Sequence, residues 1–331
     1  MTQTEVTPRT LARRRARRAR TRRHRAIGIT AQVAGGAVVL GVLAGVLSGG
    51  QWPWVIATYA RWPQTVVAIV AAAVLLRLGW WRTGTLLALV AAALVGSVVG
   101  PLRALDTVEA PPDQTLRIAV HNTGFRAGDV AAFADAIRAA EPDLVVLLES
   151  EDIAEQLDAR LDGVSLLPTP GPGGRDTAPP AVLARRPWRT EVVPLAGERP
   201  ATIVTADIAG QPVDVVAIHP LPPMTAAWAA SHQRSITALV DEVLPRGRPH
   251  VVACDCNTTP WSPSMRRLLD TDLREPTVVP TFGLPLLGIP VDHVLLSPSV
   301  AAVSRELGAF NGSDHRMIVT DVTVTDEAAA R

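Results

Sequence analysis

Residues 250–257 read His-Val-Val-Ala-Cys-Asp-Cys-Asn, an apolar β-type run that ends in an acid and an amide. A related arrangement recurs downstream, where Asp292 opens the run Asp-His-Val-Leu-Leu and where Asp314 and His315 precede Met-Ile-Val. Strands that begin or end in carboxylates, amides and imidazoles place these groups at one rim of a sheet. Such a rim can bind a metal and a phosphate, so the pattern predicts an enzyme site.

Three polar residues end apolar runs earlier in the chain. Asn122 follows Leu-Arg-Ile-Ala-Val-His, Glu149 follows Leu-Val-Val-Leu-Leu, and His219 follows Val-Asp-Val-Val-Ala-Ile. A hard divalent cation prefers carboxylate oxygens and water as ligands. Glu149 together with Asp314 can provide such oxygens, which predicts a metal site.

The downstream residues have complementary roles in the hydrolysis of a phosphate ester. That reaction needs an oriented water and charge stabilisation at the phosphate oxygens, and Asp255 and Asn257 can hold both. A histidine needs a carboxylate to fix its tautomer and support its charge. Asp292 is the natural partner of His315.

Strands and helices alternate after residue 115. The patterns predict strands at 116–121, 144–149, 202–208, 213–219, 250–254, 291–297 and 316–324. They predict helices at 129–140, 153–161, 224–243 and 263–270. This content forms one globular domain over residues 116–325 with a sizeable core.

Five stretches carry a resemblance to a known family: LRIAVHNTG, EPDLVVLLES, VVACDCNTTPWSPSMRRLL, VDHVLLSP and NGSDHRMIV, in the family's order over residues 116–324. The chain resembles the endonuclease/exonuclease/phosphatase superfamily, which includes DNase I-like nucleases, sphingomyelinases and inositol-phosphate phosphatases. The resemblance implies an α/β (α+β) four-layer sandwich of two packed mixed β-sheets flanked by helices. It also implies Mg²⁺ or Mn²⁺ as the cofactor.

The resemblance assigns roles to individual residues. It implies that Glu149 is the metal-binding glutamate, that Asn122 is the amide of the first motif beside the metal, and that Asp314 is the acid beside His315. It further implies that Asp255 and Asn257 orient the water and phosphate, that Asp292 and His315 form the carboxylate–imidazole pair, and that His219 contacts the phosphate. The chain departs from the usual pattern at His121, Gly124 and the Cys-Asp-Cys-Asn sequence, and it offers no clear acidic partner for His219.

Other residues of reactive type receive structural interpretations. His121, His232 and His293 are expected to be structural, and Trp261 is expected to pack against the following helix. Cys254 and Cys256 flank the catalytic aspartate and, two residues apart on a strand, have poor geometry for a disulfide. The sequence favours two small apolar residues packed beneath that strand.

The first hundred residues differ sharply from the rest in charge. Residues 1–100 hold 13 Arg and one acid, a formal charge of +12, whereas residues 101–331 hold 19 Arg and 30 acids, a formal charge of −11. The Arg-rich segment 1–26 is predicted to be disordered. A nucleic-acid-binding run is the alternative, but an apolar segment follows at once, which favours a cytoplasmic anchor beside anionic lipid.

Three apolar segments follow this tail and predict three transmembrane helices over residues 27–102. They run over about 27–48, 62–81 and 83–102, with tryptophans near their ends as in an interfacial belt. A signal peptide is the alternative for the first segment. Arg placement puts the N-terminus in the cytoplasm. The linker 103–115 and the domain that follows are then extracytoplasmic, in a multi-pass protein of the plasma membrane.

Charge and anchoring guide the choice of substrate. Nucleases bind largely by neutralising phosphates, to which a domain of charge −11 is poorly suited. Three spans hold a catalytic rim near lipid headgroups, and the apolar loop 277–290 can either contact lipid or pack against its own sheet. The arrangement resembles actinobacterial membrane phosphatases linked to teicoplanin-type resistance. It implies hydrolysis of a lipid phosphate such as undecaprenyl pyrophosphate. An extracellular nuclease or phosphodiesterase and a non-catalytic phosphate-binding domain are the alternatives.

Overall fold

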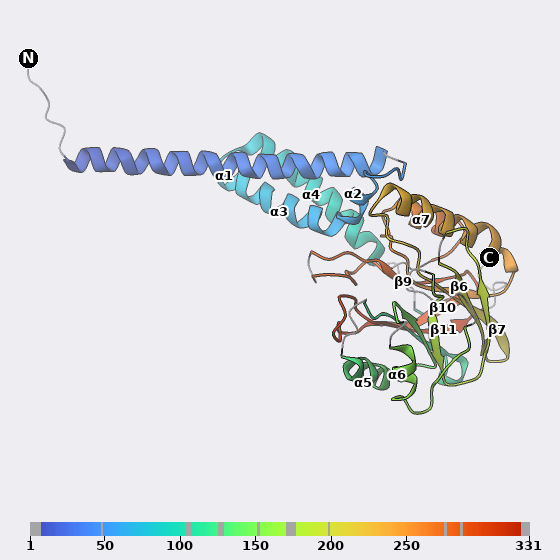
Figure 1. The fold of residues 1–331 in the computed structure, drawn as a ribbon. Coiled ribbons are helices and arrows are strands. Elements are labelled where there is room, and N and C mark those ends of the chain that lie inside the picture. Colours follow the sequence, from blue (N-terminus) through green and yellow to red (C-terminus); the bar gives the residue numbers. More distant parts are fainter. Residues whose placement is uncertain are drawn as a thin grey trace, which may run out of the picture.

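The structure is a computed structural model in which a helical bundle is joined to an α/β domain (Figure 1). It describes residues 8–47, 49–102, 107–124, 129–150, 153–169, 177–197, 199–274, 277–284 and 287–325. Residues 1–7 of the predicted tail and 103–106 of the predicted linker lie outside these ranges.

Four helices form the N-terminal part: α1 (Pro8–Leu47), α2 (Ile56–Tyr59), α3 (Arg61–Arg77) and α4 (Trp81–Leu102). The bundle's buried cluster is rich in alanine, with Ala68, Ala71 and Ala72 on α3. Gly35 faces Leu87 so closely that an added Cβ would lie 2.5 Å from a leucine methyl carbon. Small residues therefore let the long helices approach each other closely.

The bundle differs from the predicted membrane segments in two respects. Helix α1 begins at Pro8, so residues 8–26 are helical where the composition predicts disorder; Arg and Ala are strong helix formers, and no Gly or Pro interrupts them before Gly28. Among the described residues, two helical segments are long and apolar enough to cross a membrane, Arg17–Leu47 and Trp81–Val99. Helix α3 has 17 residues and is not one of them, so three spans are not confirmed.

The α/β domain contains two mixed sheets. The first has the strand order β10-β11-β1-β2-β4-β3, formed by Val300–Leu307, Ile318–Val324, Leu116–Asn122, Leu144–Leu148, Ala181–Ala184 and Ser165–Leu166. The second has the order β5-β6-β7-β8-β9, formed by Arg189–Val193, Ala201–Ile208, Gln211–Ile218, His250–Asp255 and Asp292–Leu296. Within each sheet one central pair is parallel, β1 with β2 and β7 with β8.

The two sheets pack face to face and are covered by helices on their outer faces. Alternate residues of both sheets form the central apolar core, including Ile118 and Val146 on one sheet and Val215 and Val251 on the other. Helices α5 (Val130–Ala140) and α6 (Ala154–Asp158) cover the first sheet. Helices α7 (Ala226–Ala238) and α8 (Pro263–Leu269) cover the second. This arrangement confirms the predicted sandwich of two mixed sheets flanked by helices.

Four strands were not anticipated from the sequence: β3, β4, β5 and β10. Strand β4 follows two prolines and has only four residues, and β10 departs from a simple alternation because a register shift interrupts its pairing between Ala302 and Ser304. These strands lie toward the sheet margins. Short, irregular outer strands carry little periodic signal.

Cys254 and Cys256 form a disulfide, so the prediction of two unlinked packing residues is wrong. An extended strand would hold residues two apart at about 6.6 Å. Here the two Cα atoms lie 4.9 Å apart, which shows that the chain bends at Asp255, the residue where strand β8 ends. The chain therefore turns where the sequence suggests continued extension.

The buried imidazole of His232 on α7 predicts loss of stability in acid. Its Nδ1 contacts the carbonyl oxygen of Leu221 at 3.0 Å, and burial lowers its pKa to about 4. Because the unfolded histidine takes up a proton near pH 6.5, its contribution is present above that pH and is lost as pH falls toward 4. We expect His232→Gln to lessen the loss of stability between pH 7 and 5 by about 2 kcal/mol. Urea unfolding at both pH values measures this, and an unchanged difference contradicts it.

Candidate active site

The polar residues at the strand ends converge at one rim of the sandwich. Strands β1 and β2 run parallel, which brings Asn122 opposite Leu148 and next to Glu149. Strands β8 and β9 are antiparallel, and Asp255 pairs with Asp292 in register. His219 directly follows β7, the parallel neighbour of β8. Two sheets thus supply one cluster of side chains.

Asp255 lies at the centre of the cluster and is 1% exposed. Its Oδ2 accepts a hydrogen bond from Asn122 Nδ2 at 2.9 Å and lies 3.4 Å from His219 Nε2, while its Oδ1 accepts from the backbone N–H of Asn257. Burial alone would raise the pKa of Asp255. The hydrogen bond from His219 and the charge of His315 outweigh burial and lower the pKa, so the carboxylate is ionised at neutral pH.

Glu149 lies beside Asp255 in the same pocket. Its Oε1 is 3.3 Å from His219 Nε2, which provides the acidic partner for His219 that the sequence did not reveal. Burial raises the pKa of Glu149, and the nearby Asp255 charge adds to this effect. Two close, buried carboxylates repel each other unless a cation lies between them.

The second half of the site is the pair of Asp292 and His315. The imidazole Nδ1 lies 2.9 Å from Asp292 Oδ2, and the Phe282 ring lies 4.8 Å from the imidazole centre. Burial would lower the pKa of His315, but the Asp292 carboxylate raises it to about 10. His315 therefore carries a proton at neutral pH, with Nε2 3.9 Å from Asp255 Oδ2.

Asn257 lies in a loop that the N-terminal helices help to hold. Its amide Nδ2 donates to the carbonyl oxygen of Pro220 at 3.0 Å. Its own carbonyl oxygen accepts a hydrogen bond from the Tyr59 hydroxyl, on α2, at 2.6 Å. Next in the loop, Thr259 donates to the carbonyl oxygen of Thr58, and Trp261 Nε1 donates to that of Ser97 on α4. Trp261 thus contacts the bundle, whereas the sequence suggested packing on α8.

In the part of the chain that the structure describes, two groups of side chains have donor atoms close enough to hold a metal ion: Glu149 with His219 and Asp255, and Asp255 with Asp292 and His315. The first fits a hard divalent cation, because two carboxylates supply oxygen ligands and their repulsion is relieved by positive charge. Such an ion would polarise the phosphoryl oxygen.

The remaining predicted metal ligands lie nearby but outside both groups. Asp314 lines the cavity that contains Glu149 and Asp255. Asn122 accepts from the N–H of Gly124 through Oδ1 and donates to Asp255 through Nδ2, so it orients the central carboxylate. Metal binding by Asp314 and Asn122 remains a prediction.

The predicted structural histidines contact no site carboxylate. The His293 ring accepts from the N–H of Thr277 and contacts the Thr258 carbonyl oxygen, both within 3.0 Å. His121 is buried with both ring nitrogens unpaired within the described part of the chain, its ring edge toward Phe133.

The arrangement can hydrolyse a phosphate ester. Ionised Asp255 and the Asn257 amide can orient a water for attack on phosphorus, and protonated His315 can stabilise the charge that develops on the phosphoryl oxygens. A sandwich with this rim defines a class of metal-dependent phosphoester hydrolases.

The chain belongs to the endonuclease/exonuclease/phosphatase family, whose sequence model matches residues 119–315. No curated protein matched the chain. A solved endonuclease/exonuclease/phosphatase from Beutenbergia cavernae is 23% identical over 65% of this chain and 72% of its own, with a TM-score of 0.49. The human Nocturnin catalytic domain with bound sulfate is 16% identical, over 68% of this chain and 99% of its own, with a TM-score of 0.51. A humanized D. rerio TDP2 is 14% identical, over 64% of this chain and 100% of its own, with a TM-score of 0.50. At these identities the likeness to the Nocturnin and TDP2 structures supports the fold alone.

Sequence reasoning missed Tyr59 and Arg199 as residues of the site. Tyr59 lies in a predicted loop between membrane segments, with nothing to connect it to a strand end 198 positions away. Arg199 lies in the loop between β5 and β6, and its buried guanidinium contacts His219. Neither position belongs to a motif or a periodic element, so no sequence signal identifies it.

Proposed function

We propose that the protein is a membrane-anchored, divalent-metal-dependent phosphohydrolase that cleaves the phosphate ester or pyrophosphate of a lipid carrier, such as undecaprenyl pyrophosphate, outside the cytoplasm. Water attacks the phosphorus, the bond to the leaving oxygen breaks, and the leaving group takes a proton. The observation that carries the proposal is a cavity lined both by the predicted catalytic groups and by apolar residues from α2, α7 and the surrounding loops.

This cavity has a volume of about 460 Å³ and is lined by Glu149, Asp255, Asp314 and His315 on its polar side. Its apolar wall contains Ile56, Leu221, Pro222, Met224, Trp228, Phe282 and Ile289. Met224 and Trp228 are also exposed to solvent, as are Leu284 and Leu287 in the apolar loop 277–290. An apolar wall beside a phosphoryl-transfer site suits a substrate with a hydrocarbon chain and a phosphorylated end.

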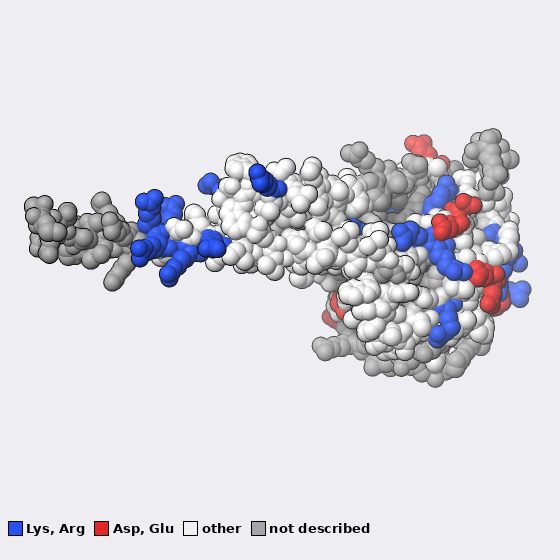
Figure 2. All heavy atoms as spheres, turned by 90° about the horizontal axis from the view of Figure 1, so that it is seen from above, with Lys and Arg blue, Asp and Glu red and all other residues white. Residues whose placement is uncertain are grey.

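The helical bundle supports placement of this cavity at a membrane surface. Its outer faces expose large apolar side chains, including Leu40, Leu43, Leu86 and Leu89, which are costly in water and favourable in lipid. In Figure 2 the middle of the bundle is free of visible charges, while arginines gather on α1 at the end far from the α/β domain. We assign residues 1–26 to a cytoplasmic tail, three membrane-spanning helices at about 27–48, 62–81 and 83–102 to a multi-pass anchor, 103–115 to a linker and 116–325 to the extracytoplasmic catalytic domain. The short helix α3 is the second of these spans, because only an odd number of crossings puts the domain outside.

Two further features agree with an extracytoplasmic catalytic domain. The Cys254–Cys256 disulfide suits an oxidising compartment, and the Arg-rich end of α1 suits the cytoplasmic side. The resemblance to actinobacterial membrane phosphatases linked to teicoplanin-type resistance also supports an extracytoplasmic catalytic domain.

The direct test uses full-length protein in detergent micelles with Mg²⁺ or Mn²⁺. We expect phosphate release from a polyprenyl pyrophosphate, loss of release in EDTA and recovery when the metal is restored. Plasmid DNA serves as the competing substrate. Degradation of DNA without phosphate release from the lipid would identify the protein as a nuclease. Binding without turnover of any phosphoester would support the non-catalytic alternative.

If the apolar wall binds the hydrocarbon chain, a change in this wall should affect a polyprenyl phosphate more than a short phosphate ester. We expect Ile56→Asp to raise KM for a polyprenyl phosphate about tenfold or more, because the cavity loses apolar surface and gains a charge. The kcat for a short, water-soluble phosphate ester should stay within twofold of the original. Val108→Asp is the matched control, since Val108 is 36% exposed and Ile56 is 37% exposed. Equal changes in KM for both variants would argue against a lipid chain in this cavity.

A further inference from the structure

Arg199 is a buried cation that the catalytic roles above do not use. It is 5% exposed and lies in the loop between β5 and β6. Helix α7 holds this loop: Arg234 donates to the carbonyl oxygen of Ala196, and a Cβ at Gly197 would lie 1.8 Å from the Ser235 hydroxyl oxygen. The backbone that carries Arg199 is therefore fixed against a helix.

The guanidinium of Arg199 approaches His219 from the side opposite the acids. Its Nη1 lies 2.6 Å from His219 Nδ1 and 3.1 Å from Nε2. Since a guanidinium only donates hydrogen bonds, the nearer Nδ1 must be the acceptor. The imidazole proton then lies on Nε2, which faces Glu149 and Asp255. Arg199 thus favours the ring orientation in which Nε2 of His219 faces the two carboxylates.

This contact leaves the Arg199 guanidinium without a salt bridge among the described residues. Its charge acts on the Glu149 carboxylate only across the His219 ring, and its buried Nε has no hydrogen-bond partner in the described part of the chain. Burying a charge without a direct ion pair is costly. An anion bound directly to the guanidinium would reduce this cost.

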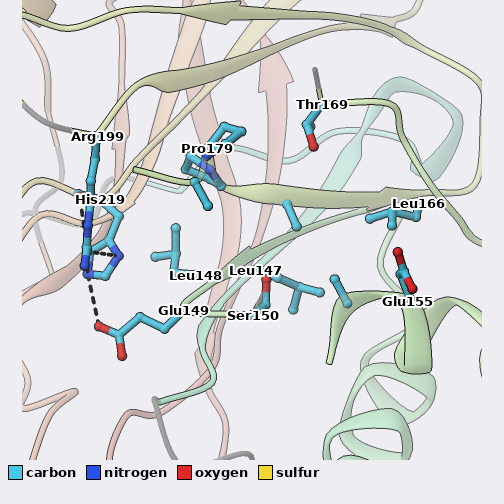
Figure 3. Close-up of a pocket in the computed structure, with 14 residues that line it drawn as sticks. Leu147, Leu148, Glu149, Ser150, Glu155, Leu166, Thr169, Pro179, Arg199 and His219 are labelled. Atoms are coloured by element: carbon cyan, nitrogen blue, oxygen red, sulfur yellow. Dashed lines mark hydrogen bonds and ion pairs between the residues drawn. The ribbon is translucent and has the colours of Figure 1, made fainter. Parts of the chain in front are cut away.

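Arg199 also lies where two cavities meet. It lines the 460 Å³ cavity described above and a second cavity of about 330 Å³, which is bounded by Ser150, Thr169 and Pro179. Glu149 lines both cavities as well. Figure 3 shows Arg199 and Glu149 on opposite sides of the His219 ring at one end of the second cavity. An anion at this junction can therefore contact the Arg199 guanidinium. It can at the same time lie next to a cation held by Glu149 and Asp255.

We propose that Arg199 is a substrate-binding residue whose guanidinium binds the non-bridging oxygens of a phosphate group, free or esterified, at the junction of the two cavities. The planar fork of N–H donors matches two phosphate oxygens, and the carboxylates beyond His219 remain free for a cation. The lipid identity of the phosphate ester rests on the proposed function. The phosphate-binding role of Arg199 does not.

Binding of inorganic phosphate to the full-length protein, with Mg²⁺ and in detergent, tests this role by titration calorimetry. We expect Arg199→Met to raise the phosphate Kd at least tenfold. Arg199→Lys should raise it less, because the charge remains but the two-point contact is lost. Arg117→Met is the control, since Arg117 pairs with Asp321 away from both cavities. It should bind phosphate as the unaltered protein does.

A folded Arg199→Met variant with a phosphate Kd within twofold of the original overturns the proposal. If this variant does not fold, Arg199→Lys decides: an unchanged Kd overturns the proposal, and a weakened Kd supports it. The two proposals fail separately. Arg199-dependent phosphate binding without lipid turnover would refute only the lipid phosphohydrolase. Lipid turnover with Arg199-independent phosphate binding would refute only the role of Arg199.

Discussion

Replacing Asp255 with Ala is expected to lower kcat by about 10³-fold or more while the protein remains folded. The Asp255 carboxylate accepts hydrogen bonds from Asn122 and from the N–H of Asn257, and it lies near both His219 and His315. Its loss removes the group that orients the water and leaves these donors without their common acceptor. Initial rates of phosphate release, measured with saturating metal, give the effect.

Asp214→Ala is the matched control for this variant. Asp214 is also a buried strand aspartate with a basic partner, Arg248, but it lies on β7 away from the polar rim. We expect it to cost stability and to leave kcat within about threefold of the original. Full activity in Asp255→Ala, or an equal loss of kcat in both variants, would show that Asp255 is not the catalytic centre.

Replacing His315 with Gln is expected to lower kcat by about 10²–10³-fold, because the protonated imidazole can no longer stabilise the charge on the phosphoryl oxygens. His250→Gln is the control, since the His250 ring contacts the Arg248 carbonyl oxygen outside the site. Comparable losses in the two variants would argue against a catalytic role of His315.

The Asp292–His315 pair also predicts a specific pH behaviour. Asp292 raises the pKa of His315 to about 10, against about 6.5 in the unfolded chain. Its contribution to stability is therefore fully present below pH 6.5 and is lost as pH rises toward 10. Asp292→Asn removes the charge and should return the His315 pKa toward neutrality. NMR of ¹³C-labelled histidine measures this pKa directly, and titration of His315 near pH 6.5 in the unaltered protein would contradict the assignment.

The strand ends could be predicted from the sequence because an apolar run followed by a polar residue is a local pattern. Asn122, Glu149, His219, Asp255 and Asp292 all lie at the rim where such runs place them. The sheets themselves followed from the same runs and from the family resemblance. The polar residue marks the end of each strand and also belongs to the site. The same local pattern therefore predicts both the strands and the candidate site residues.

Features that depend on contacts between distant segments could not be predicted in this way. Whether Arg199 is buried against His219 depends on packing of its loop on α7, and the Cys254–Cys256 bond depends on a bend at Asp255, where strand β8 ends. The helical tail is a different failure: composition suggested disorder, but the strong helix preference of Arg and Ala extends α1 to Pro8. In residues 8–26 the helix preference of the individual residues therefore outweighs the repulsion of their like charges.

The hydrogen bond from Tyr59 to the carbonyl oxygen of Asn257 has a consequence for the life of the protein in the cell. The loop that carries Asn257 is braced by α2, and Trp261 in the same loop donates to the carbonyl oxygen of Ser97 on α4. Ile56 on α2 also lines the substrate cavity. Proteolytic release of the α/β domain from the bundle would remove part of its own active-site wall. We therefore expect the released α/β domain to lose phosphate-releasing activity that the full chain has.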